Sequence, residues 1–323
     1  MSKRNILVAL TWIPSSMAGI EIDNYSASAN LRFSGQAGFI GDPYDFSGVG
    51  RSTDSVVGSA NRVWATLIGA NTFVSAAHYS PRVGETIRFT DGNSTSSLNY
   101  DYLVKGAFVV PGTDIWIGYT DGPIESSLKR YAFDNTPANS LADTGLAGQS
   151  LFMNGDRALG GPGLITDHAV GINEAESWWE AGDSSHATPE WTALYAAPAA
   201  FDILVTFQNE SGDNANNYAF HEGQVQRGDS GSPLFQVASG ELEIVGLGWA
   251  VADSLDGNFI DTFGPRNTFT DPLEMRDASY FSYVGSYEDQ ISATLSRVPP
   301  PIPEPGSAGM FLLAIASACR RKR

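Results

Sequence analysis

The sequence predicts an all-β protein, a barrel or a sandwich, with little helix. Short runs rich in Val, Ile, Thr and Phe recur along the chain between turns of Gly, Asn, Asp and Ser, which is typical of such folds. Long segments with a 3.6-residue apolar period are scarce. The chain has 323 residues, of which 34 are glycine and 42% are hydrophobic. It is therefore long enough for a large core in one domain or two lobes.

The predicted strands can be justified in chain order. The first apolar run ends in small residues before His78. In the next run apolar and polar residues alternate around Arg88, and a third alternating run extends from Ile115 to Tyr119. Two segments with clustered Trp and Ala, 176–182 and 190–197, are predicted to form short helices instead. No internal repeat is visible. The strand-bearing segments are 66–78, 85–92, 107–122, 202–214 and 242–257.

The two ends read as targeting segments outside the fold. Residues 1–18 have a basic start, a short apolar run and small residues up to Ala18, the pattern of a secretory signal peptide. Residues 303–323 contain Pro-Glu-Pro, an apolar run too short to span a bilayer comfortably, and a final basic cluster. This order resembles the PEP-CTERM sorting signal. The resemblance implies transient membrane association, recognition by an exosortase in a bacterial cell envelope, and removal of the tail. The alternative is a short membrane anchor.

Charge and cysteine content exclude several classes of function. The formal net charge of −17 disfavours binding to nucleic acid and to anionic membrane surfaces. The only cysteine, Cys319, lies in the tail, so the body can form no intramolecular disulfide and has no cysteine nucleophile or zinc–thiolate site. The four histidines form no HExxH pair, which argues against a zinc hydrolase.

Three residues carry the pattern of a nucleophilic site. His78 follows an apolar strand, Asp114 stands at the head of another, and Ser230 lies between two glycines in QRGDSGSPLF. A nucleophilic serine needs a base within hydrogen-bond reach and an acid that orients the base. The order His, Asp, Ser excludes α/β-hydrolases, because no histidine follows Ser230, and it differs from the subtilisin order.

These motifs resemble those of the trypsin-like, chymotrypsin-fold serine proteases. The segments SAAHY, DIWIGYTDGPI and GDSGSPLF are similar to the family motifs around its histidine, aspartate and serine. The resemblance covers about residues 45–285. It implies an all-β fold of two packed antiparallel β-barrels, with the active site at their interface and lobes of about 45–135 and 136–285. Residues 19–44 then form an N-terminal segment of unclear role, and residues 286–302 a linker.

The resemblance also implies roles for single residues. Ser230 is expected to be the nucleophile, His78 the general base and acid, and Asp114 its orienting carboxylate. The backbone N–H groups of Gly228 and Ser230 are expected to form the oxyanion hole. Gln224 falls at the base of the specificity pocket, and its lack of charge argues against a strict Arg or Lys preference.

The sequence departs from the family pattern in three places. Tyr79 replaces the usual cysteine after the histidine, and the family's disulfides are absent. There is no clear activation site; GFIGD at 38–42 only weakly resembles a mature start, so an inserted amino terminus could pair with Asp229. The candidate specificity strand is IVGLGWAVADS, whose register is ambiguous.

The sequence thus predicts an exported serine endopeptidase acting on protein or peptide substrates through an acyl-enzyme, without a cofactor. Two alternatives remain: a non-catalytic envelope or matrix protein on the same scaffold, and an esterase with the same triad. No metal site is predicted. The Asp- and Asn-rich loops 91–101, 209–217 and 253–258 offer oxygen ligands for Ca²⁺ but fit no EF-hand pattern, so solvated turns are favoured.

Overall fold

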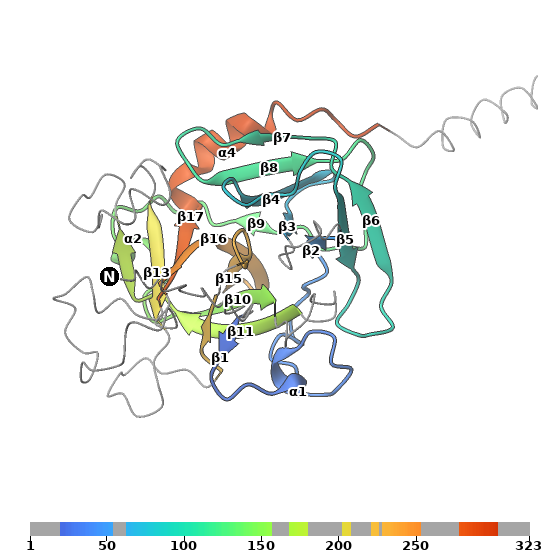
Figure 1. The fold of residues 1–323 in the computed structure, drawn as a ribbon. Helices are drawn as coiled ribbons and strands as arrows, with labels where there is room; N and C mark the ends of the chain where they lie inside the picture. The colour runs from blue at the N-terminus through green and yellow to red at the C-terminus, as the bar shows by residue number, and fades with distance from the viewer. Residues whose placement is uncertain are drawn as a thin grey trace, which may run out of the picture.

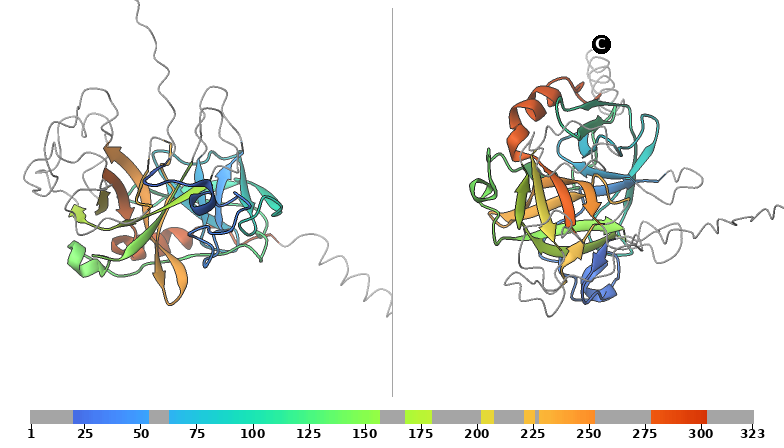
Figure 2. Two further views of the ribbon diagram at one scale, coloured as in Figure 1. Left: turned by 90° about the horizontal axis from the view of Figure 1, so that it is seen from below. Right: turned by 60° about the vertical axis from the view of Figure 1, so that its left-hand side comes forward.

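The computed structural model describes residues 20–53, 63–156, 168–179, 202–207, 221–225, 228–252 and 278–302. The expected signal peptide, the sorting tail and the predicted helix at 190–197 lie outside these residues. Within them, two large, mainly antiparallel sheets occupy separate halves of the molecule (Figures 1 and 2), and a third sheet has only two strands. The mostly β architecture and the two curled sheets confirm the predicted all-β fold class with two lobes.

The first sheet contains seven strands in the order β6-β5-β2-β3-β4-β8-β7. Its interior is apolar, because strand residues such as Leu67, Phe73, Ile87 and Phe89 are fully buried, and cross-strand packing of this kind is what stabilises a sheet. The strands are β2 (Val49–Ser52), β3 (Trp64–Leu67), β4 (Thr72–Ala76), β5 (Thr86–Thr90), β6 (Asn99–Leu103), β7 (Gly106–Val109) and β8 (Ile115–Tyr119).

The second sheet contains eight strands: β11-β10-β15-β16-β17-β13-β12, with β9 beside β16. Strand β9 pairs in parallel with β16. Because β9 ends at Phe133, the second sheet begins slightly before the expected lobe boundary at residue 135. The strands are β9 (Ala132–Phe133), β10 (Ser150–Asp156), β11 (His168–Glu174), β12 (Ser177–Trp179), β13 (Ile203–Phe207), β15 (Pro233–Ala238), β16 (Glu241–Ala252) and β17 (Ala278–Tyr283). A short helix, α2 (Leu141–Thr144), precedes β10.

The predicted helix at 176–182 is wrong where the structure describes it. Residues 177–179 form β12, which pairs antiparallel with β13, with Trp178 opposite Leu204. The Trp178 ring packs edge-on against Tyr283 at 5.2 Å between ring centroids. A short apolar cluster cannot be assigned to helix or strand by periodicity alone, and here pairing with a distant strand decides the outcome.

The N-terminal segment is an integral part of the fold. Strand β1 (Glu21–Ile22) pairs with β14 (Gly223–Gln224), and the short helix α1 (Ala27–Asn30), capped by the Ser26 hydroxyl, follows it. Ile20 and Ile22 are buried in the core of the second lobe. Residues 20–22 therefore stabilise the second lobe, a role that the sequence does not reveal.

A buried polar network joins the two lobes through this segment. Arg32 is 1% exposed, and its guanidinium donates to the carbonyls of Val49, Thr90 and Gly92 in the first lobe. It also lies 3.4 Å from His168 Nδ1, and His168 Nε2 lies 2.8 Å from Asn154 Oδ1, both in the second lobe. Arginine has no acceptor atom, so Nδ1 accepts and Nε2–H donates.

Burial shifts the titration of both basic groups in this network. Burial lowers the pKa of Arg32 to about 10, so the guanidinium stays charged at neutral pH. Burial, followed by the charges of Arg32 and Arg51, holds the pKa of His168 well below its ordinary value. His168 is therefore neutral in the folded protein.

The segment expected to be a linker is instead folded onto the body. Residues 285–287 form a 3₁₀ turn, η4 (Gly285–Tyr287), and α4 (Glu288–Leu295) follows it. Tyr287 and Ile291 are buried in the core that spans both lobes, and Leu295 and Val298 pack against it. Ile291 and Leu295 are four residues apart, which places them on one face of α4. The expected linker at 286–302 is thus wrong, because this apolar face is buried.

The last described residues are held against the first lobe. The Ile302 N–H donates to the Asp121 carbonyl at 2.7 Å, and the Asn71 side-chain amide donates to the Pro299 carbonyl at 3.2 Å. Figure 1 shows α4 beside β7 and β8. No helix in the described part of the chain is long and apolar enough to cross a membrane.

Candidate active site

The pairing of β4 with β8 brings His78 and Asp114 together. In this antiparallel pair Ala76 lies opposite Ile115, so the residues after β4 face those before β8. The ladder continues one bond further, since the Ala77 N–H donates to the Asp114 carbonyl at 2.6 Å. Two residues that are 36 positions apart therefore become neighbours by strand register.

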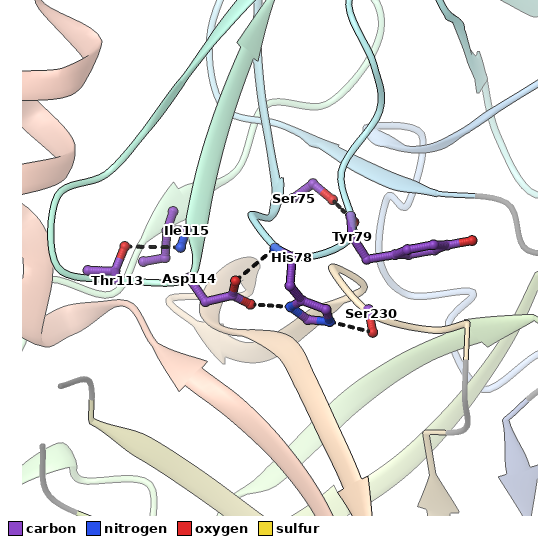
Figure 3. Close-up of polar contacts among 7 residues, drawn as sticks. All are labelled: Ser75, His78, Tyr79, Thr113, Asp114, Ile115 and Ser230. Atoms are coloured by element: carbon purple, nitrogen blue, oxygen red, sulfur yellow. Dashed lines mark hydrogen bonds and ion pairs between the residues drawn. The ribbon is translucent and has the colours of Figure 1, made fainter. Parts of the chain in front are cut away.

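The side chains of Asp114, His78 and Ser230 form one hydrogen-bonded relay (Figure 3). His78 Nδ1 lies 2.5 Å from Asp114 Oδ2, and His78 Nε2 lies 2.9 Å from Ser230 Oγ. An ionised carboxylate can only accept, so the proton is on Nδ1. Nε2 is then an acceptor, and the Ser230 hydroxyl donates to it. This is the tautomer that a general base requires.

The Asp114 carboxylate is held in place from both sides. Its Oδ1 accepts the backbone N–H of His78 at 2.9 Å, and the residue is only 8% exposed. Before it, Thr113 Oγ donates to the Val110 carbonyl at 3.0 Å and accepts the Ile115 N–H at 3.0 Å. The turn therefore fixes the backbone on both sides of Asp114, and the carboxylate has little freedom to rotate.

The glycine after Ser230 allows the turn Gly228–Ser232, called the nucleophile turn because it bears the candidate nucleophile, to approach β4. Gly231 has φ of 81°, a region that other residues rarely adopt. A Cβ atom there would lie 2.3 Å from Ser75 Oγ and 2.8 Å from the Ala76 nitrogen. Gly231 thus provides both the backbone conformation and the space that place Ser230 beside His78.

The same turn is bonded to β16 on its other side. The Gly231 N–H donates to the Gly248 carbonyl at 2.7 Å, and the Gly248 N–H donates to the Ser232 carbonyl at 2.8 Å. A Cβ at Gly248 would lie 3.0 Å from the Asp229 carbonyl oxygen. This fixes the register that the sequence leaves ambiguous: Gly248 and Trp249, in the candidate specificity strand, lie next to the nucleophile turn.

The backbone around Ser230 also presents two N–H groups that no described protein group accepts. Gly228 has φ of 103°. Among the residues that the structure describes, no protein group accepts a hydrogen bond from the N–H of Gly228 or of Ser230. The N–H of Ser232, by contrast, donates to the Asp229 carbonyl at 2.9 Å. Two N–H groups with no acceptor among the described residues, beside a candidate nucleophile, are what an oxyanion site requires.

Gln224 lies in β14, opposite Glu21 of β1, and is 1% exposed. The neighbouring Val225 N–H donates to Ser279 Oγ on β17 at 3.1 Å. Residues 226 and 227, which connect this strand to the nucleophile turn, lie outside the described residues. The role of Gln224 as the base of a specificity pocket therefore stays a prediction.

Ile20 lies beside the Asp229 side chain. A Cβ at Gly155 would lie 2.4 Å from Ile20 Cβ and 2.8 Å from Asp229 Oδ2, so both side chains meet at this glycine. Asp229 is 1% exposed and its Oδ1 accepts the Asp156 N–H at 2.7 Å. Ile40, in the GFIGD segment, instead bonds through its N–H to the Ala29 carbonyl and packs against the core between the lobes.

The two carboxylates of the loop 91–101 are bonded to groups of the first lobe. Asp91 accepts the Leu98 N–H at 2.7 Å and the Tyr100 hydroxyl at 3.3 Å, while Asp101 pairs with Arg88 at 2.5 Å. Within the described ranges, no group of three or more His, Cys, Asp or Glu side chains could hold a metal ion. The other two loops considered for Ca²⁺, 209–217 and 253–258, lie outside the described residues.

Comparisons with known proteins find solved structures of similar fold but no matching family model or curated protein. A scan against family models and a search of curated proteins find no match. Solved structures that resemble the chain include a scabies mite inactivated protease paralogue (14% identity, TM-score 0.49, covering 80% of this chain and 95% of that one). Human heparin binding protein also resembles it (15% identity, TM-score 0.47, 80% and 95%). A third is the inactive form of the Rv3671c protease of M. tuberculosis (13% identity, TM-score 0.42, 79% and 90%).

Proposed function

We propose that this protein is an exported serine endopeptidase that hydrolyses peptide bonds through an acyl-enzyme. The observation that carries the proposal is the continuous relay from Asp114 through His78 to Ser230, with 2.5 Å and 2.9 Å separations. Fold alone does not determine activity, so the proposal depends on this geometry and on the donors beside it.

The geometry supports the following reaction. Ser230 Oγ attacks the substrate carbonyl carbon as its proton moves to His78 Nε2. The carbonyl oxygen becomes an oxyanion that accepts hydrogen bonds from the N–H groups of Gly228 and Ser230. Nε2–H then protonates the leaving amine, which leaves an ester on Ser230. Water, deprotonated by the same nitrogen, hydrolyses that ester, and Asp114 stabilises the imidazolium throughout.

Export and processing form the second part of the proposal. The signal peptide would be removed near Ala18, and the tail 303–323 by exosortase-type machinery, with the body retained at or released from the bacterial cell surface. Cleavage near Ala18 places the new amino terminus within one or two residues of Ile20, which is buried beside Asp229. Removal of the signal peptide would therefore itself supply the inserted terminus that the family resemblance associates with an ordered site.

The proposal is tested by labelling the mature protein with a fluorophosphonate and by measuring hydrolysis of fluorescently labelled casein. Wild type should be labelled on Ser230 and should cleave casein. Ser230→Ala should lose the label and reduce kcat by about 10⁴-fold or more. Ser292→Ala, an exposed position in α4, is the matched control and should behave as wild type.

Three outcomes would contradict the assignment in different ways. Near-normal casein cleavage by Ser230→Ala would show that the nucleophile is another residue. A wild-type protein that neither reacts with the phosphonate nor cleaves casein would favour a non-catalytic scaffold. Labelling of Ser230 and turnover of p-nitrophenyl esters without any peptide cleavage would favour an esterase.

A further inference from the structure

The nucleophile turn is connected to the first lobe by a second route that does not pass through the triad. This route begins at Arg51 in β2. Arg51 is 4% exposed, and its Nη1 lies 2.7 Å from Asp156 Oδ1, at the end of β10 in the second lobe. The guanidinium also lies 5.0 Å from the centroid of the Trp64 ring. An ion pair thus crosses between the lobes with little access to water.

The route continues from Asp156 to the residue before the nucleophile. The Asp156 backbone N–H donates to Asp229 Oδ1 at 2.7 Å, and the Asp229 carboxylate is buried. The Asp229 carbonyl in turn accepts the Ser232 N–H at 2.9 Å. Asp229 is therefore bonded both to the Ser232 end of the Gly228–Ser232 turn and to the backbone at the end of β10.

The Arg51–Asp156 ion pair lies at the end of β10. Asp156 is the last residue of the strand, and its pairing with His168 is the last pair of the β10–β11 ladder. Arg32 and Arg51 both contribute to the lowered pKa of His168, so Arg51 lies in a region already rich in buried positive charge. A buried pair such as Arg51–Asp156 contributes little net stability, because desolvation offsets the attraction. Its more specific effect is to fix a position.

We propose that Arg51 is a positioning residue for the nucleophile turn: through Asp156 and Asp229 it sets the orientation of the Gly228 and Ser230 N–H groups. This inference rests on the proposed function for its catalytic consequence. Its structural consequence, the ordering of the turn, can be measured without any turnover. It assigns a role to an inter-lobe ion pair that belongs to none of the three sequence motifs.

The chain offers a closely matched control. Arg88 lies directly opposite Arg51 in the β2–β5 pairing, and it also forms an ion pair, with Asp101 on the neighbouring strand. That pair is largely exposed and stays within the first lobe. Replacing Arg88 therefore removes the same side-chain type from the same sheet without touching the route to Asp229.

The test compares Arg51→Gln with Arg88→Gln. In the first measurement, hydrogen exchange of the peptide 228–235 is followed by mass spectrometry, well below the melting temperature of each variant. We expect exchange of this peptide to accelerate about 10-fold or more in Arg51→Gln, with strands of the first sheet unchanged. Arg88→Gln should match wild type. Equal exchange in the two variants would overturn the proposal.

The second measurement tests the oxyanion hole through the rates of labelling and of peptide hydrolysis. Because removal of a single oxyanion donor costs about 10²- to 10³-fold in rate, a displaced donor pair should slow fluorophosphonate labelling and casein kcat by about 10- to 100-fold. KM should change by less than about twofold. Arg51→Lys keeps the charge and can replace a single contact, so it should recover part of the loss. Loss only in KM would overturn the proposal.

Two further comparisons cover the cases in which Arg51→Gln does not fold or the wild type is inactive. If Arg51→Gln does not fold, Asp156→Asn serves instead, since it keeps the backbone N–H and nearly the same volume while removing the charge. If wild type shows no labelling and no turnover, the proposed function fails, while the exchange comparison still decides the role of Arg51. Faster exchange over the whole protein in either variant, rather than in peptide 228–235, would show a general stabilising role and refute positioning.

Discussion

The change Asp114→Asn tests the relay with almost no change in side-chain volume. The carboxylate accepts two hydrogen bonds, from the His78 ring at 2.5 Å and from the His78 backbone N–H at 2.9 Å. An asparagine side chain has only one acceptor atom, so it cannot replace both. If its oxygen faces the ring, its NH₂ group meets the backbone N–H, and two buried donors oppose each other at a cost of about 1–3 kcal/mol.

The amide therefore takes the opposite orientation. Its oxygen accepts the backbone N–H, and its NH₂ group donates to Nδ1, which must then be unprotonated. The ring proton moves to Nε2, which can no longer accept from Ser230. In related triads this tautomer reduces kcat about 10⁴-fold, equivalent to about 5.5 kcal/mol of transition-state stabilisation. We expect the same reduction here, with an unfolding free energy close to that of wild type.

The measurement is casein kcat/KM, together with thermal unfolding of the same preparations. Asp101→Asn is the control, because Asp101 is the acid of the exposed pair with Arg88 in the same lobe. It should keep wild-type activity. More than about one tenth of wild-type activity in Asp114→Asn would refute the tautomer argument, since the predicted 10⁴-fold loss is far larger. Equal losses in both variants would show a general effect of the altered charge.

Three other predictions follow from the fold and the ends of the chain. Because burial holds the pKa of His168 low, the unfolded chain binds more protons than the folded one below about pH 6.5, and the unfolding free energy should fall by about 1.4 kcal/mol for each unit by which the pH is lowered. Urea titrations at several pH values should show a flatter dependence of the unfolding free energy on pH in His168→Gln, and an unchanged slope would contradict this. Deleting 303–323 should leave activity and stability intact, whereas deleting 286–323 also removes buried Tyr287 and Ile291, each contributing about 1.5–3 kcal/mol, and should lower stability in differential scanning calorimetry; equal stability of the two truncations would refute the core role of α4. Intact mass of the envelope-associated protein should show a start near Ala18 and an end near Pro303 to Gly306, and a mass that includes Arg323 would leave a membrane anchor as the explanation of the tail.

The sequence is informative where chemistry is carried by short motifs. His78, Asp114 and Ser230 each lie in a recognisable local pattern, and their order along the chain selects one family of arrangements. The glycine on each side of the Asp-Ser pair also indicates a turn of unusual backbone conformation, and both have positive φ. These features are local, so they can be read without knowing which distant segments will meet.

The sequence is uninformative where a residue acts through a distant partner. Arg51 and Asp156 carry no motif, and only the packing of the two lobes places them 2.7 Å apart. Residues 286–302 read as a linker because their proline-rich end is expected to break secondary structure, yet the apolar face of α4 is covered by the core. Trp178 lies in a cluster that suits a helix as well as a strand, and pairing with β13 decides it.

The pairing of β1 with β14 has a consequence for the order in which the protein can fold. Glu21 lies opposite Gln224, so β1, the first strand of the described residues, must wait for a partner that follows the whole first lobe and much of the second. Contacts of such long sequence separation form late and slow the folding reaction. A growing chain that has completed its first lobe still lacks the partner of β1 and the segment that bears Ser230. The proposed triad therefore cannot assemble during synthesis of the amino-terminal half, and it can form only after Ser230 has been added to the chain.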